Sequence, residues 1–206
     1  MMTNLSLYPV LPQIELYALF DLFCDLYSAA QAKLGSSIYS YSIADFTVSL
    51  VFASPAPVPL LTPALVPLAS SNEAAPHLTF YLQDDASTPV EPSQSWTQAD
   101  IDLHREVPTF SNEQLLTAIQ PDISAVSVLN RSRAVGFYWI DSSCSLRTYE
   151  RAAPLKVLLH WWLRERSLAM IHAGAVGTEA GSVLFVSGTG AGKFTTTLAY
   201  LNAGLH

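Results

Sequence analysis

The chain has 206 residues, of which 50% are hydrophobic and 13% are charged, and its formal net charge is -7 at pH 7. Such a composition excludes a disordered chain and is typical of a folded domain with its own core. Lysine and arginine together number only 10 and form no basic run, so we expect no nucleic-acid partner.

Cysteine content and the N-terminal residues bear on localisation. Cys24 and Cys144 have no second pair nearby, so their spacing favours neither a disulfide framework nor a zinc site, and a reducing compartment is expected. The N-terminus lacks the basic flank and cleavage site of a secretory signal, and Asp21 and Asp25 interrupt the apolar stretch that follows. We therefore expect a cytoplasmic protein without a membrane partner.

The first predicted element is a helix that begins near Leu16 and ends at Gly35. Its apolar residues recur at spacings of three and four, which is the pattern of one helical face. They are Leu16, Leu19, Phe20, Phe23, Leu26, Tyr27 and Ala30. Because the opposite face carries Asp21 and Asp25, we expect the helix to pack on a core rather than lie on a membrane surface.

Residues 39–53 are rich in β-branched and aromatic types and predict one or two strands. The prolines that follow exclude a regular central strand and predict a short helix or an ordered loop covering a sheet. They are Pro55, Pro57, Pro59, Pro63 and Pro67. A proline-rich ligand for the aromatic groove of a partner is the alternative.

Further along, residues 77–85 predict a strand, residues 111–119 (SNEQLLTAI) a short helix, and residues 123–141 a hairpin. Together these elements predict a mixed α+β domain over residues 1–148.

A connecting amphipathic helix is predicted over residues 149–167, which include the stretch AAPLKVLLHWWLRERS. Pro154 would occupy its first turn, where proline is well tolerated. One stripe of the helix is apolar. That stripe consists of Leu155, Leu158, Leu159, Trp162 and Leu163.

Residues 168–206 contain two apolar runs, LAMIHAGAVG and GSVLFVSG, separated by the turn-like TEAG. The second run ends in the stretch VSGTGAGKFTTTLAY. This order predicts strand, turn, strand, glycine-rich loop and helix. Glycines let successive backbone N–H groups converge on an anion, a lysine reaches phosphate oxygens, and the helix N-terminus favours negative charge. The predicted phosphate-binding residues are Gly188, Thr189, Gly190, Ala191, Gly192, Lys193, Phe194 and Thr195.

Two positions depart from the G-x-x-x-x-G-K-[ST] pattern of phosphate loops. Ser187 stands at the first glycine, and Phe194 stands at the final hydroxyl. That hydroxyl normally ligates Mg²⁺, which an aromatic ring cannot do. We therefore expect phosphate affinity to survive better than catalysis. An ordinary glycine-rich turn is the alternative interpretation.

Residues 149–205, which include both apolar runs and the loop, resemble the start of the catalytic domain of bacterial HPr kinase/phosphorylase-like proteins. The resemblance implies an α/β P-loop serine kinase domain akin to phosphoenolpyruvate carboxykinase, beginning in residues 168–206. It further implies that ATP and Mg²⁺ are cofactors and that the phosphoacceptor is a serine on a protein or peptide. Residues from Gly188 to Lys193 would hold the ATP phosphates, and His172 would act catalytically beside the transferred phosphoryl group.

The family's aspartate-bearing strand, which supplies the metal ligand and the base, would follow His206. The resemblance therefore implies a chain truncated within its kinase domain, unable to transfer phosphate alone, with an exposed sheet edge or apolar patch. Whether the chain forms a homo-oligomer is left open by the sequence. The alternative is a non-catalytic module that binds a partner and carries a vestigial phosphate loop.

Two acidic patterns lie earlier in the chain. Asp100, Asp102, His104 and Glu106 alternate and could face a metal ion from an extended strand, although a solvated strand edge is the more common role. We therefore predict no metal site from these four residues. Asp84 and its neighbour Asp85 would diverge on a strand, so they would make a poor acid/base pair.

Overall fold

The structure is a computed structural model in two compact units, which we call unit 1 (Met1–Trp162) and unit 2 (Leu163–His206). The described residues are 16–71, 74–84, 101–102, 105–141, 146–188 and 190–205. No helix within these ranges has both the length and the apolar character needed to cross a bilayer.

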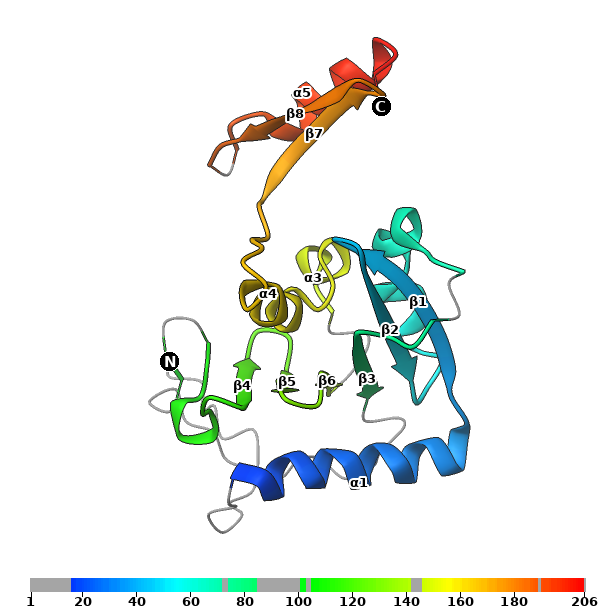
Figure 1. Cartoon of the computed structure of the whole chain (residues 1–206), viewed down its shortest axis with the longest axis vertical. Helices are drawn as coiled ribbons and strands as arrows, with labels where there is room; N and C mark the ends of the chain where they lie inside the picture. The colour runs from blue at the N-terminus through cyan, green and yellow to red at the C-terminus, as the bar shows by residue number, and fades with distance from the viewer. Residues whose placement is uncertain are drawn as a thin grey trace, which may run out of the picture. The chain divides into compact units, whose positions relative to one another are not determined.

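Unit 1 is built on a six-stranded mixed sheet with the strand order β1-β2-β3-β6-β5-β4 (Figure 1). Its strands are β1 (Ser37–Ile43), β2 (Phe46–Phe52), β3 (Leu78–Asp84), β4 (Leu115–Gln120), β5 (Ala125–Asn130) and β6 (Val135–Ile140). The central strands β2, β3 and β6 run parallel, and the remaining neighbours are antiparallel. The expected mixed α/β architecture is confirmed for this unit.

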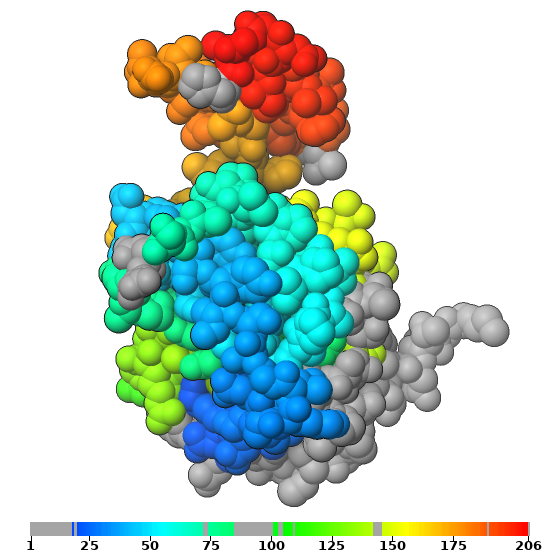
Figure 2. Space-filling view, turned by 90° about the vertical axis from the view of Figure 1, so that its right-hand side faces the viewer, coloured from blue at the N-terminus to red at the C-terminus, as the bar shows by residue number. Residues whose placement is uncertain are grey.

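The proline-rich segment supplies the crossover between the parallel strands β2 and β3. It forms the short helix α2 (Val58–Leu61) and the 3₁₀ helix η1 (Pro63–Leu68). After η1 the chain reaches the outer edge of β1, where the N–H of Ser70 donates to the carbonyl of Ser40 over 2.9 Å. Figure 2 shows β1, α2 and η1, coloured light blue to cyan, together on one face of unit 1. The prediction of a short helix after β2 is therefore confirmed.

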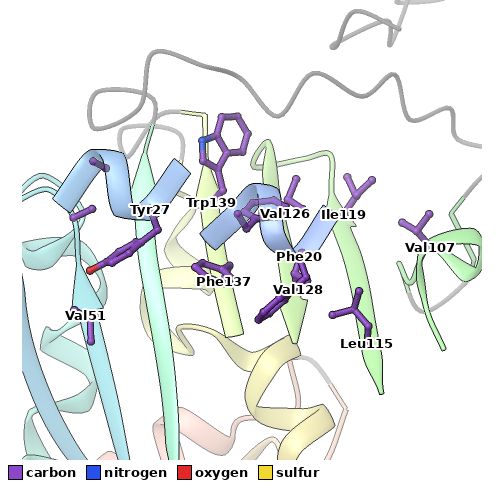
Figure 3. Close-up of a cluster of buried hydrophobic side chains, with 13 residues drawn as sticks. Phe20, Tyr27, Val51, Val107, Leu115, Ile119, Val126, Val128, Phe137 and Trp139 are labelled. Atoms are coloured by element: carbon purple, nitrogen blue, oxygen red, sulfur yellow. The ribbon is translucent and has the colours of Figure 1, made fainter. Parts of the chain in front are cut away.

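Helix α1 (Leu16–Leu34) covers one face of the sheet, and the prediction of its bounds is confirmed. Its buried face and the strands form one apolar cluster (Figure 3). That cluster contains Phe20, Phe23, Tyr27, Ala30, Val51, Ala53, Val107, Leu115, Ile119, Val126, Val128, Phe137 and Trp139. The helix ends at Gly35, whose φ of 78° is a left-handed conformation that glycine adopts readily.

The opposite face of the sheet is covered by α3 (Thr148–Ala152) and by α4 (Lys156–Arg164), as Figure 1 shows. Glu150 of α3 is 1% exposed, and its carboxylate accepts hydrogen bonds from Tyr138 Oη at 3.2 Å and from Gln120 Nε2 at 3.3 Å. The ring of Trp162 in α4 lies edge-on to Phe46, with centroids 4.9 Å apart. Unit 1 therefore has three layers, with the sheet between helices.

The buried carboxyl of Glu150 makes the stability of unit 1 depend on pH. Burial raises its pKa above the ordinary value of 4.5, although hydrogen bonds from Gln120 and Tyr138 and the charge of Lys156 act in the opposite direction. Because the folded pKa exceeds the unfolded one, protonated Glu150 stabilises the fold below pH 4.5, and this contribution is lost as the pH rises through the folded pKa.

We expect Glu150→Gln to remove this pH dependence. Relative to the variant, wild type should lose up to about 1.4 kcal/mol of unfolding free energy per pH unit within the window between the two pKa values. Urea titrations at several pH values measure the difference. Glu113→Gln, at an exposed site, is the control and should leave the wild-type profile unchanged. If the unfolding free energies of Glu150→Gln and wild type change with pH in parallel, the pKa of this carboxyl does not differ between the folded and the unfolded protein.

The prediction of a helix over residues 111–119 is wrong, because most of this stretch belongs to strand β4. The side chain of Asn112 caps the turn before the strand by accepting the N–H groups of Gln114 and Leu115, each at 2.7 Å. On its outer edge β4 bonds to an extended segment, with the N–H of Val107 donating to Thr117 O at 2.9 Å. All six residues of β4 are buried, so the sequence shows none of the alternation that marks a half-exposed strand.

The connecting helix predicted over residues 149–167 is divided into α3 and α4. Ala153, the C-cap of α3, has φ of -139° and ψ of 70°, so it lies outside the helical region, which the following proline disfavours. Leu155 then adopts a φ of 58° before α4 begins. All five residues of the predicted apolar stripe are nevertheless buried. The pattern predicted the buried face correctly, and Pro154 lies in the break rather than in a first turn.

Unit 2 consists of the antiparallel hairpin β7 (Ala173–Thr178) and β8 (Gly181–Val186) and of helix α5 (Lys193–Asn202). The predicted order of strand, turn, strand, loop and helix is confirmed. The rings of Phe185 and Tyr200 stack with centroids 5.7 Å apart, so α5 lies against the hairpin. Val183, Leu184 and Val186 of β8 are 58%, 55% and 65% exposed. Three apolar side chains of this strand are therefore exposed, with Leu184 and Val186 on one face and Val183 on the other.

Candidate phosphate-binding loop

The candidate site is the loop that joins β8 to α5 in unit 2. Gly190 and Gly192 adopt left-handed φ values of 81° and 83°, which cost a side-chain-bearing residue about 1–2 kcal/mol each. Gly192 is also the N-cap of α5. Thr189, one of the predicted phosphate-binding residues, lies outside the described residues. The two glycines thus allow the sharp turn by which the strand enters the helix.

The start of α5 presents backbone donors. The first backbone bond of the helix runs from the N–H of Thr196 to the carbonyl of Gly192, at 2.9 Å. The preceding N–H groups, those of Lys193, Phe194 and Thr195, have no backbone acceptor among the described residues. Donors of this kind at a helix N-terminus carry partial positive charge and are suited to bind an anion.

Lys193 adds a full positive charge at the loop. Its Nζ donates to the carbonyl of Ser187 at 2.7 Å and to that of Gly188 at 3.0 Å. The side chain therefore folds back across the loop instead of extending into solvent. An ammonium group has three donors, so a further acceptor such as a phosphate oxygen could share it.

Gly174 of β7 allows the first turn of α5 to approach the hairpin. A Cβ atom added at Gly174 would collide with the hydroxyl of Thr197 and come within 3.4 Å of the carbonyl of Lys193. Thr197 Oγ1 in turn donates to that same carbonyl at 2.9 Å. Gly174 was absent from the predicted site residues, although a glycine within a strand is a recognised signal of close backbone approach.

His172, the predicted catalytic residue, immediately precedes β7 and is exposed. The hairpin register pairs Ala173 with Val186, so His172 and the first loop residue, Ser187, lie at the same end of the hairpin. The fold of unit 2 thus brings the histidine and the beginning of the loop to one end, although they are far apart in sequence.

The hydroxyl position of the phosphate-loop pattern is filled by Phe194, whose side chain is 75% exposed at the first turn of α5. An aromatic ring supplies no oxygen ligand, so this residue does not fit the Mg²⁺ that the resemblance implies. Among the described residues of the loop, the backbone N–H groups at the start of α5 and the ammonium group of Lys193 are donors that suit an anion.

The earlier acidic pattern serves structural hydrogen bonds. Asp102 Oδ1 accepts the N–H of Glu106 at 2.8 Å, and Glu106 Oε1 accepts the indole N–H of Trp161 at 2.8 Å. Asp100 and His104 lie outside the described residues. Asp84 is buried and its Oδ1 accepts the hydroxyl of Ser54 at 2.8 Å, while Asp85 is also outside the described part of the chain.

Comparisons of the chain with protein-family models, with curated proteins and with solved structures found no match. The resemblance of residues 149–205 to HPr kinase/phosphorylase-like proteins therefore stays a hypothesis. Any functional assignment of the loop depends on its own residues and geometry.

Proposed function

We propose that the loop between β8 and α5 binds the phosphates of ATP. The observation that carries this proposal is the combination of two features. The first backbone N–H groups of α5 have no backbone acceptor in the described part of the chain, and the ammonium group of Lys193 is folded over the loop. Both features place positive charge at the same short segment. Because a helix N-terminus and a lysine each favour an anion, the two together favour a phosphate group over a neutral ligand.

In this proposal the ancestral reaction is the ATP-dependent phosphorylation of a serine on a protein or peptide. Unit 2 would form the first part of a kinase domain akin to phosphoenolpyruvate carboxykinase, with His172 beside the transferred phosphoryl group. Phosphoryl transfer requires charge stabilisation, a base and positioning together. Phe194 removes one oxygen ligand for the metal, so we propose that this chain alone binds nucleotide without transferring phosphate.

A second candidate function is a non-catalytic module that binds a partner and carries a vestigial loop. It is favoured by the exposure of Val183, Leu184 and Val186 on β8, since an exposed apolar strand can accept another chain. In this function the glycines of the loop would serve only the turn into α5. If the partner is a second copy of this chain, this candidate function leads to a homo-oligomer.

Calorimetric titration of the 206-residue chain with ATP separates the two candidates. We expect saturable binding with a stoichiometry near one ATP per chain. The same titration with adenosine, which lacks phosphates, is the control and should show much weaker binding, because the proposed contacts are to phosphate oxygens. If neither ligand binds, the loop is vestigial and the second candidate stands.

A further inference from the structure

Mg²⁺ requires near-octahedral oxygen ligands and usually takes one or two carboxylates besides the phosphates. In phosphate loops the hydroxyl after the lysine supplies a further ligand. Here that residue is Phe194, with its ring 75% exposed. The side chain at this position therefore contributes no ligand to a metal bound beside the phosphates.

The neighbouring hydroxyls do not replace the missing one. Thr195 is rotated by about 100° around the helix axis from the position of Phe194. The hydroxyl of Thr197 faces Gly174 of β7 and donates to the carbonyl of Lys193 at 2.9 Å. This hydroxyl thus bonds within α5, on the side of the helix that lies against β7.

The printed sequence of unit 2 offers few carboxylates as further metal ligands. Its only acidic residues are Glu165 and Glu179. Glu179 lies in the turn between β7 and β8, whereas the loop follows the other end of β8. A six-residue strand separates the two, which corresponds to about 20 Å at about 3.3 Å per residue. Glu165 precedes β7 and lies 3.9 Å from Arg166 in an ion pair.

We propose that the phosphate site of unit 2 binds its anion without Mg²⁺. This inference rests on the proposed function and adds the ligand class, a metal-free phosphate such as free ATP. The backbone donors of α5 and the ammonium group of Lys193 supply the positive charge. Because Mg²⁺ bound to ATP cancels part of the phosphate charge while gaining no ligand from the side chain of Phe194, the metal offers no added affinity at this site.

The test is a pair of ATP titrations of the full chain, one in excess magnesium chloride and one in EDTA. We expect the metal to tighten binding by less than about threefold, or to weaken it, where threefold corresponds to about 0.65 kcal/mol. Tighter binding in magnesium by more than this factor would overturn the inference while leaving the proposed ATP site standing. No binding in either buffer would remove both.

Two variants at one position sharpen the test. Phe194→Ser restores the hydroxyl, and we expect it to gain a preference for magnesium of about threefold or more. Phe194→Ala removes the ring without adding an oxygen, and it should stay insensitive to the metal. If magnesium also leaves the ATP affinity of Phe194→Ser unchanged, the missing hydroxyl at residue 194 is not the cause of the metal independence. That result would overturn the argument from Phe194.

Discussion

Replacing Phe137 by alanine is expected to lower the unfolding free energy of unit 1 by about 3–5 kcal/mol. Phe137 is 2% exposed and lies at the centre of the aromatic contacts between α1 and the sheet. Its ring centroid is 5.4 Å from that of Phe20, 5.9 Å from that of Phe23 and 5.4 Å from that of Tyr81. Removing the ring would leave a cavity between α1 and the sheet. The neighbouring rings, two from α1 and one from β3, cannot fill it together.

Urea unfolding followed by tryptophan fluorescence measures this loss. The signal reports unit 1, because Trp139, Trp161 and Trp162 are buried there. Phe194→Ala is the matched control, since it deletes the same ring at a site that is 75% exposed, and it should change the unfolding free energy by less than about 0.5 kcal/mol. A Phe137→Ala protein within about 1 kcal/mol of wild type would show that α1 does not depend on this ring for its packing.

Replacing Lys193 by methionine is expected to weaken ATP binding by about 10- to 100-fold. A hydrogen bond to a charged group contributes about 1.5–3 kcal/mol, and each 1.4 kcal/mol is a tenfold change in the dissociation constant. Methionine keeps most of the length of the side chain but removes both the charge and the donors that reach Ser187 and Gly188. Calorimetric titration with ATP measures the change.

The control for this variant is Lys33→Met, which makes the same substitution in the last turn of α1. Both proteins should keep the tryptophan fluorescence and urea midpoint of wild type, since neither lysine belongs to the buried cluster of unit 1. If Lys193→Met binds ATP within about threefold of wild type, the ammonium group does not contact the nucleotide, and the proposed phosphate site is contradicted.

Elements whose signals are local were predicted well from the sequence. The spacing of apolar residues defines α1, and a glycine after the last turn marks its end at Leu34. In unit 2 the run of glycines and Lys193 at the end of β8 predicted the loop and the beginning of α5. Each of these signals depends on residues within about two helical turns. It can therefore be recognised in the sequence without knowledge of the rest of the fold.

The sequence by itself also determined that residue 194 has no oxygen to offer a metal, because this is a property of the phenylalanine side chain. The tertiary structure alone decided that residues 115–120 form a strand, because β5 bonds to one edge of it and the segment around Val107 bonds to the other. It likewise decided that Glu150 is buried against Tyr138 and that Gly174 lies under the first turn of α5. These outcomes depend on contacts between residues distant in the chain, whose free energy outweighs the weak local preferences that a sequence pattern records.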